Sequence, residues 1–175
     1  MEKLIIGLTR LGYLIENDEK KPFNMSVFKN RFFYQKFIFL LNELSNELNY
    51  NYNWYIRGPY SPDLTKDLFY IDELWNHNRA FISMINEKNI NDKTIDNTIV
   101  NINFLKSSFK EEFNREWDAT DLEILSSLLF IDKYTYAKCK NSKINTIEEF
   151  KARKPELTDK PIDNYWEILK TSEFI

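Results

Sequence analysis

Few side chains of this sequence have the chemistry that catalysis or metal binding requires. Its 175 residues include one cysteine, Cys139, and one histidine, His77. A zinc site draws its ligands from several clustered Cys, His or carboxylate side chains. Lys138 and Lys140 flank the cysteine and can lower a thiol pKa, but the histidine that would activate it is remote in sequence. We therefore expect no catalytic residue, no metal and no cofactor, and a protein that is not an enzyme.

The most distinctive segment is a sharp turn at residues 57–62, Arg-Gly-Pro-Tyr-Ser-Pro. Glycine permits a positive φ or a close backbone approach, and proline fixes its own φ. Serine followed by proline is typical of a helix start, where the hydroxyl caps the helix. The predicted structural turn consists of Gly58, Pro59, Ser61 and Pro62.

Two interpretations of this turn remain open. In the structural one, Tyr60 packs under the turn, and Arg31 or Arg57 joins a buried network with Asp67. In the functional one, Arg57 and Tyr60 are exposed and bind a partner, because arginine and tyrosine combine large contact area with hydrogen bonds. The candidate binding residues are Arg57, Tyr60, Lys66 and Tyr70.

A second set of side chains has the composition of a nucleic-acid patch. Lysines surround Tyr134 and Tyr136, and basic residues interleaved with aromatic ones can bind nucleic acid by charge and stacking. The alternative is a solvated face whose lysines lie near a helix C-terminus, where the helix dipole favours them. The candidate patch consists of Lys133, Lys138, Lys140 and Lys143.

The composition indicates one compact, soluble domain. With 43% hydrophobic residues but only three glycines and five prolines, the chain has material for a core and for short loops. A net charge of −3 gives no general attraction to nucleic acid. No apolar run approaches the ~20 residues that span a bilayer, and the N-terminus lacks a signal-peptide pattern. We expect a cytoplasmic protein without a membrane partner.

The spacing of apolar residues predicts a mostly α-helical chain with a small β element. Alternation of asparagine with tyrosine and tryptophan predicts a short strand at 49–56. Residues 80–85 are ambiguous between a wing-like strand and a helical turn, and we prefer the strand. The predicted helices cover residues 2–15, 26–48, 62–75, 94–115, 121–134, 147–153 and 162–170.

Two capping boxes indicate where helices begin in the second half of the chain. In such a box, a threonine and a glutamate three residues later satisfy donors at the same helix end. Thr120 with Glu123 predicts a helix start at 121, and Thr146 with Glu149 predicts one at 147.

Two stretches carry a family pattern. They are Phe28-x-x-Arg31-x-x-x-Gln35-Lys36-x-x-x-Leu40-Leu41 and Tyr52-x-Trp54-Tyr55-x-Arg57-Gly58-Pro59-Tyr60-Ser61-Pro62-Asp63-Leu64-x-x-Asp67. The pattern resembles the small YwgA-like proteins of bacteria and archaea and, more distantly, the Panacea domain of antitoxins and phage-associated proteins. Tyr34 replaces the usual leucine before the Gln-Lys pair. The resemblance implies a winged-helix-like part at 1–90, on which a helical extension at 91–175 packs in a single compact domain.

Two hypotheses of function follow. The first is a non-catalytic regulatory or protein-binding module, antitoxin-like or from a phage or mobile-element conflict system, as the resemblance implies. The second is a DNA-binding transcriptional regulator that uses the basic patches. The helix at 62–75 would occupy the major groove in a winged helix. Its expected exposed face carries four acids and one base, which duplex DNA repels, so we expect another protein as the partner.

Overall fold

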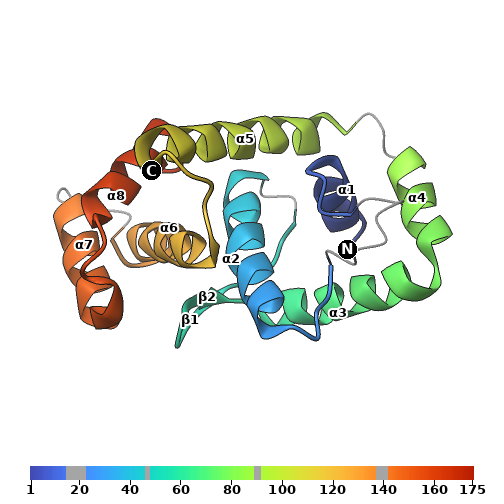
Figure 1. Ribbon diagram of the computed structural model, residues 1–175, viewed down its shortest axis with the longest axis horizontal. Helices are drawn as coiled ribbons and strands as arrows, with labels where there is room; N and C mark the ends of the chain where they lie inside the picture. The colour runs from blue at the N-terminus through green and yellow to red at the C-terminus, as the bar shows by residue number, and fades with distance from the viewer. Residues whose placement is uncertain (15–22, 46–47, 89–91, 137–141) are drawn as a thin grey trace.

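The computed structural model describes residues 1–14, 23–45, 48–88, 92–136 and 142–175. These residues form helices and one small antiparallel hairpin, which confirms the predicted mostly α chain with a small β element (Figure 1). The elements are α1 (Glu2–Arg10), α2 (Phe28–Ser45), β1 (Asn53–Tyr55), β2 (Gly58–Tyr60), α3 (Pro62–His77), α4 (Arg79–Lys88), α5 (Lys93–Phe113), α6 (Ala119–Ile131), a π-helical turn (Asp132–Tyr136), α7 (Ser142–Arg153), a 3₁₀ turn (Pro155–Leu157) and α8 (Ile162–Thr171).

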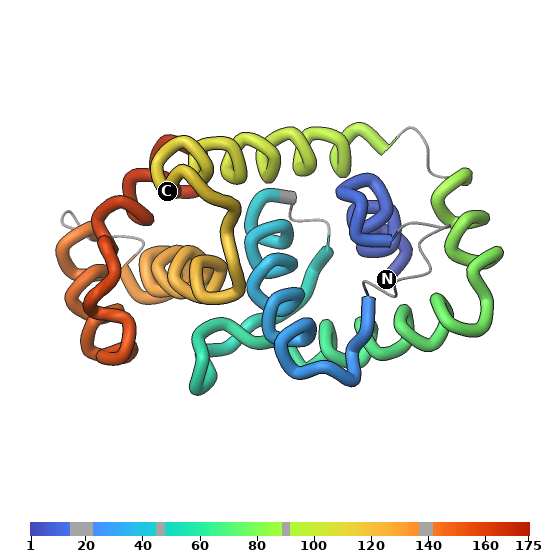
Figure 2. The backbone as a smooth tube through the Cα atoms, in the orientation of Figure 1, coloured from blue at the N-terminus to red at the C-terminus, as the bar shows by residue number. Residues whose placement is uncertain are grey.

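Helices α2 and α6 lie at the centre of the fold and pack on each other. Every residue of α6 from Asp121 to Ile131 is buried, as expected of a helix that other elements surround. Helix α5 runs along one edge from α1 to α8, α3 lies along the opposite edge, and α4 lies at one end of the molecule beside α1 (Figure 2). None of the helices in the described ranges is long and apolar enough to cross a membrane.

The first strand of the hairpin between α2 and α3, β1, has three residues and is shorter than the strand predicted at 49–56. Tyr55 pairs with Gly58 and Asn53 pairs with Tyr60, so Ile56 and Arg57 form a two-residue connection. Gly58 has a φ of 83°, which confirms the predicted positive φ at this position. The second strand, β2, falls inside the predicted turn at 57–62, because pairing with β1 extends the backbone there.

The strand preferred at 80–85 is wrong, because these residues lie within helix α4. Ile82 and Ile85 are both buried, and a spacing of three places them on one face of a helix. The hairpin therefore precedes α3, and among the described residues no strand follows α3 as the predicted wing would.

Both predicted capping boxes are wrong. Helix α6 is capped by Asp118, and the Asp121 carboxylate accepts a hydrogen bond from the Asp118 backbone N–H at 2.7 Å. This box replaces the predicted pair of Thr120 and Glu123. Thr146 is buried inside α7, which begins four residues earlier at Ser142. The same local residue pattern is compatible with more than one helix start. The start that is adopted is the one that lets the apolar face of the helix pack in the core.

Asp121 also ties α8 to the segment before α6. The Arg115 guanidinium donates two hydrogen bonds to its carboxylate, at 2.6 and 2.8 Å, and the Tyr165 hydroxyl donates one at 2.6 Å. Burial raises the pKa of Asp121, but the hydrogen bonds from Arg115 and Tyr165 outweigh burial and lower that pKa below its usual value. The ionised form is therefore favoured in the folded protein.

We expect Asp121 to make stability sensitive to acid. Because the Asp121 pKa is lower in the folded than in the unfolded chain, its stabilisation is present above the unfolded pKa of about 4 and is lost as pH falls through the folded value. Asp121→Asn should lower the free energy of unfolding by about 1–3 kcal/mol at pH 7. It should also make the decrease of this free energy between pH 5 and 3 smaller than in the wild type. Urea unfolding at several pH values measures both effects. Asp159→Asn, at an exposed position, is the control, and equal acid slopes for wild type and Asp121→Asn would contradict the prediction.

Candidate functional site

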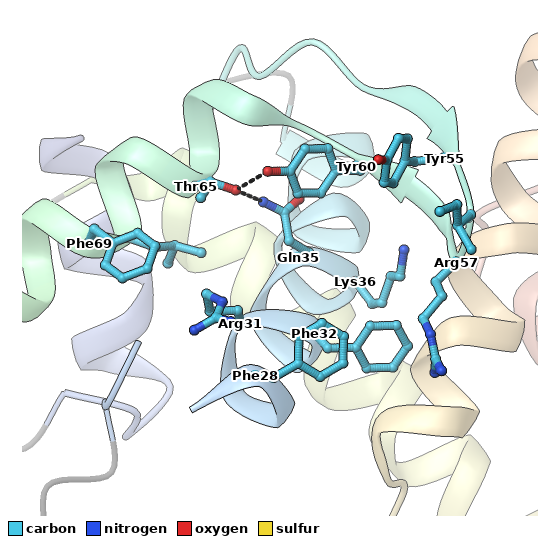
Figure 3. Close-up of a pocket in the computed structure, with 13 residues that line it drawn as sticks. Phe28, Arg31, Phe32, Gln35, Lys36, Tyr55, Arg57, Tyr60, Thr65 and Phe69 are labelled. Carbon is cyan, nitrogen blue, oxygen red and sulfur yellow. Dashed lines mark hydrogen bonds between the residues drawn. The ribbon is translucent and has the colours of Figure 1, made fainter. Parts of the chain in front are cut away.

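A cavity of about 350 Å³ opens between the first turns of α2, the hairpin and the first turns of α3 (Figure 3). The turn singled out in the sequence forms one of its walls. The lining residues are Phe28, Arg31, Phe32, Gln35, Lys36, Tyr55, Ile56, Arg57, Gly58, Tyr60, Thr65, Leu68 and Phe69.

Most of this wall is apolar and aromatic. Phe28 and Phe32 stack with ring centroids 6.1 Å apart on α2, and Tyr55 faces Tyr60 on the hairpin at 5.7 Å. Phe69 lies on the α3 side, and Leu68 is buried beside it. The rings surround the open space from three elements (Figure 3).

Three cations interrupt the apolar wall, and the lining includes no carboxylate. The Lys36 amine is deepest: the side chain is 2% exposed and donates a hydrogen bond to the Pro59 carbonyl oxygen at 2.7 Å. The pKa of Lys36 is lowered from 10.5 to about 7: burial is the main cause, the positive charges of Lys154 and Arg57 add to it, and the negative charge of Glu123 opposes it.

The two arginines lie at the sides of the cavity. The Arg57 guanidinium lies 5.5 Å from the Phe32 ring centroid. The Arg31 guanidinium lies 5.8 Å from the rings of both Phe28 and Phe69, and it donates to the Met25 carbonyl oxygen at 2.6 Å. The backbone before α2 thus orients Arg31, and its guanidinium group makes cation–π contacts with Phe28 and Phe69.

The amide of Gln35 fixes the start of α3. Its Nε2 donates to the Ser61 carbonyl oxygen at 2.9 Å, and its Oε1 accepts from the Ser61 backbone N–H at 3.0 Å. Nε2 also donates to the Thr65 hydroxyl, which donates to the Tyr60 hydroxyl oxygen at 3.0 Å (Figure 3). The Ser61 hydroxyl accepts from the Leu64 N–H at 3.3 Å, which confirms the predicted cap.

Behind the turn lies a second buried lysine. Lys154 is fully buried, forms an ion pair with Glu123 of α6 and donates to the Ile56 carbonyl oxygen at 3.2 Å. Gly58 packs so closely on α6 that a Cβ added there would overlap the Ser127 hydroxyl. Lys36 and Lys154 therefore bind the carbonyl oxygens on either side of Arg57 and Gly58, those of Pro59 and Ile56. Gly58 allows this backbone to approach α6 closely.

Two of the four predicted binding residues, Arg57 and Tyr60, line the cavity. Lys66 and Tyr70 do not: both lie on the outer side of α3, where Lys66 pairs with Asp63 at 3.2 Å. Gly58 and Pro59 thus form part of strand β2, and Ser61 and Pro62 form the start of α3. Arg57, Gly58 and Tyr60 also line the cavity.

The predicted network of Asp67 with Arg31 or Arg57 is wrong. Asp67 accepts a hydrogen bond from the Tyr50 hydroxyl at 2.5 Å. The expected acidic face of α3 also changes, because Asp72 is buried and accepts a hydrogen bond from the Met25 N–H at 3.1 Å.

The candidate nucleic-acid patch is only partly described. Lys133 pairs with Glu43 at 3.4 Å. Lys143 pairs with Asp163 and Glu167 of α8, at 3.2 and 2.7 Å. Lys138 and Lys140 lie outside the described residues. The described lysines of the patch are thus largely neutralised by neighbouring carboxylates.

Sequence reasoning did not assign the α2 side of the cavity to the site. Gln35 and Lys36 were visible only as members of the family pattern, although a polar pair between Tyr34 and the apolar run at 37–41 is a signal of a buried polar contact. Phe28, Phe32 and Phe69 carried no such signal, because aromatic residues at helical spacing more often form a core.

No protein-family model matches this chain, and no curated protein and no solved structure matches it. The resemblance to YwgA-like proteins and the Panacea domain therefore rests on the two stretches quoted above. Within the described ranges, no group of three or more His, Cys, Asp or Glu side chains has the arrangement to hold a metal ion.

Proposed function

We propose that this protein is a non-catalytic protein-binding module that takes up a segment of a partner polypeptide at the cavity between α2, the hairpin and α3. The observation that carries the proposal is the apolar rim of the cavity. Its members are each 45–78% exposed although large and hydrophobic, and exposed apolar groups gathered around a hollow mark interaction sites. The apolar rim consists of Phe28, Tyr55, Ile56 and Phe69.

The rigidity of the wall supports the same proposal. Gln35, Lys36 and Lys154 hold the backbone on both sides of the turn through hydrogen bonds. A wall that is already ordered loses little conformational entropy when a partner binds. Aromatic residues and arginine, which make up most of the wall, are also the side chains that contribute most to protein interfaces.

The family resemblance supports a regulatory role for this binding. A role like that of an antitoxin, or of a protein from a phage or mobile-element conflict system, is compatible with the binding of another protein at the exposed apolar rim. The alternative of a DNA-binding regulator draws less support, because Lys133 and Lys143 are paired with carboxylates. A gel shift with duplex DNA that disappears after charge reversal of Lys138 and Lys140 would favour that alternative.

Selection from a library of displayed random peptides tests the proposal. We expect wild-type protein to enrich peptides that bind at the cavity. Ile56→Ser with Phe69→Ser should weaken their binding at least about tenfold, because two of the four exposed side chains of the apolar rim are lost while the core is unchanged. Fluorescence anisotropy of the labelled peptides gives the dissociation constants.

The matched control removes two exposed apolar side chains from another face. Val100 and Phe104 lie on α5 and are also exposed. Val100→Ser with Phe104→Ser should change peptide affinity by less than about twofold. Equal losses in the two double variants, or a selection that enriches no peptide, would count decisively against the proposal.

A further inference from the structure

The side chains around the turn beside the cavity carry more positive than negative charge. The charged groups that act on the Lys36 amine are Arg57 on the hairpin, Lys154 after α7 and Glu123 on α6. Glu123 is already paired with Lys154. The described residues thus provide two cations, Lys36 and Arg57, without a carboxylate in contact. Lys36 is buried, whereas Arg57 is exposed. Buried charges are normally paired, so the buried amine of Lys36 favours an anion that comes from outside the chain.

We propose that the cavity is a carboxylate-binding site, and that the partner segment inserts an aspartate or glutamate side chain between Lys36 and Arg57. This inference rests on the proposed function, and it names the chemistry by which the partner is recognised. The carbon atoms next to the carboxylate then pack against the rings of Phe28, Phe32 and Phe69.

The number of free donors fits a carboxylate. An ammonium group has three N–H donors, and the Pro59 carbonyl oxygen takes one from Lys36. Two remain, beside a guanidinium whose planar fork matches the two oxygens of a carboxylate. Lys36 and Arg57 each place their charged group 5.5 Å from the centroid of the Phe32 ring, so both cations lie beside the same aromatic side chain of the cavity wall.

The distribution of the apolar rim favours an internal side chain over a chain terminus. Tyr55 and Ile56 border the cavity on the hairpin side, whereas Phe28 and Phe69 border it on the helical side (Figure 3). A segment that crosses the opening contacts both sides and inserts a side chain in the middle. A terminal residue would leave one side of the rim uncovered.

The buried amine couples this binding to pH. Burial brings the pKa of Lys36 down to about 7, and an anion in contact raises the pKa of an amine. Binding therefore takes up a proton when the free protein has a neutral Lys36. The affinity for a carboxylate should be highest below pH 7 and should fall as pH rises above it.

A pair of small probes isolates the carboxylate from the peptide. 3-Phenylpropanoate and its neutral amide, 3-phenylpropanamide, have the same shape, and their binding to the full chain can be followed by NMR shifts of backbone amides. We expect the acid to bind at least about tenfold more tightly than the amide at pH 6.5, with shifts at the cavity. In protein labelled with ¹³C-lysine, the acid should also move the Lys36 titration to higher pH.

Three variants assign the effect to its residues. Arg57→Gln, at an exposed position, and Lys36→Met should each remove most of the preference for the acid. Lys66→Gln, outside the cavity wall, should leave it unchanged. In the selected peptides, exchange of the acidic residue for its amide should weaken binding by a similar factor. Arg57→Gln keeps the test decisive if Lys36→Met does not fold.

The possible outcomes separate the two proposals. Equal binding of acid and amide, or NMR shifts away from the cavity, overturns the carboxylate site. The protein-binding function is then still tested separately by the peptide selection. A clear preference for the acid in a protein that selects no rim-dependent peptide overturns the protein-binding function and leaves the carboxylate site in place.

Discussion

Lys154→Met is expected to destabilise the protein by about 3–5 kcal/mol at pH 7, because it leaves the buried Glu123 carboxylate without its partner. The Ile56 carbonyl oxygen loses a donor in the same step. A thioether side chain fills most of the lysine volume, so the loss reports the charge rather than a cavity. Urea unfolding followed by circular dichroism measures the free energy.

Two further variants separate the ion pair from general effects of losing a lysine. Lys151→Met, at an exposed position of α7, should cost less than about 0.5 kcal/mol. Glu123→Met combined with Lys154→Met should be at least about 1 kcal/mol more stable than Lys154→Met alone, because no unpaired charge remains. A double variant as unstable as the sum of its single variants would show that the ion pair is not what Lys154 contributes.

Gly58→Ala is expected to cost about 3 kcal/mol, since two penalties combine. Alanine at a φ of 83° is strained, and its Cβ would overlap the Ser127 hydroxyl. Gly12→Ala is a matched control, because Gly12 has a φ of 80° but no heavy atom within 4 Å of the added Cβ. It should cost only about 1 kcal/mol. Thermal and urea unfolding of both variants give the comparison.

A double variant tests the contact between the turn and α6. The Ser127 hydroxyl is buried and, within the described part of the chain, makes no hydrogen bond, so Ser127→Ala alone should be nearly neutral. Gly58→Ala in the Ser127→Ala background should lose only the strain of the positive φ, about 1 kcal/mol. Equal costs for Gly58→Ala in both backgrounds would argue against the overlap.

Features that depend on neighbouring residues could be predicted from the sequence. Ser61 and Pro62 start a helix because a hydroxyl cap and a preset φ act within one turn. The positive φ of Gly58 follows in the same way from the Gly-Pro pair. The long helices were found because apolar spacing over many residues leaves few alternatives.

Features that depend on distant residues were missed. Glu123 fits a capping box with Thr120, but Lys154, 31 residues away, pairs with it instead. Residues 80–85 are apolar enough for a strand, and the burial of Ile82 and Ile85 in the fold selects a helix. The cavity itself was not predictable, because Lys36 and Arg57 come together only when the hairpin folds back on α2.

The position of Lys154 also has a consequence for protein synthesis. The turn at Ile56 lies in the first half of the chain, yet its carbonyl oxygen is bound by a side chain from the last quarter. During translation this support of the cavity wall is therefore absent until residue 154 has left the ribosome. A nascent chain that is only slightly shorter than this contains every residue that lines the cavity but lacks the side chain that binds the Ile56 carbonyl oxygen behind it. We therefore expect full recognition of a partner only after most of the chain has been made.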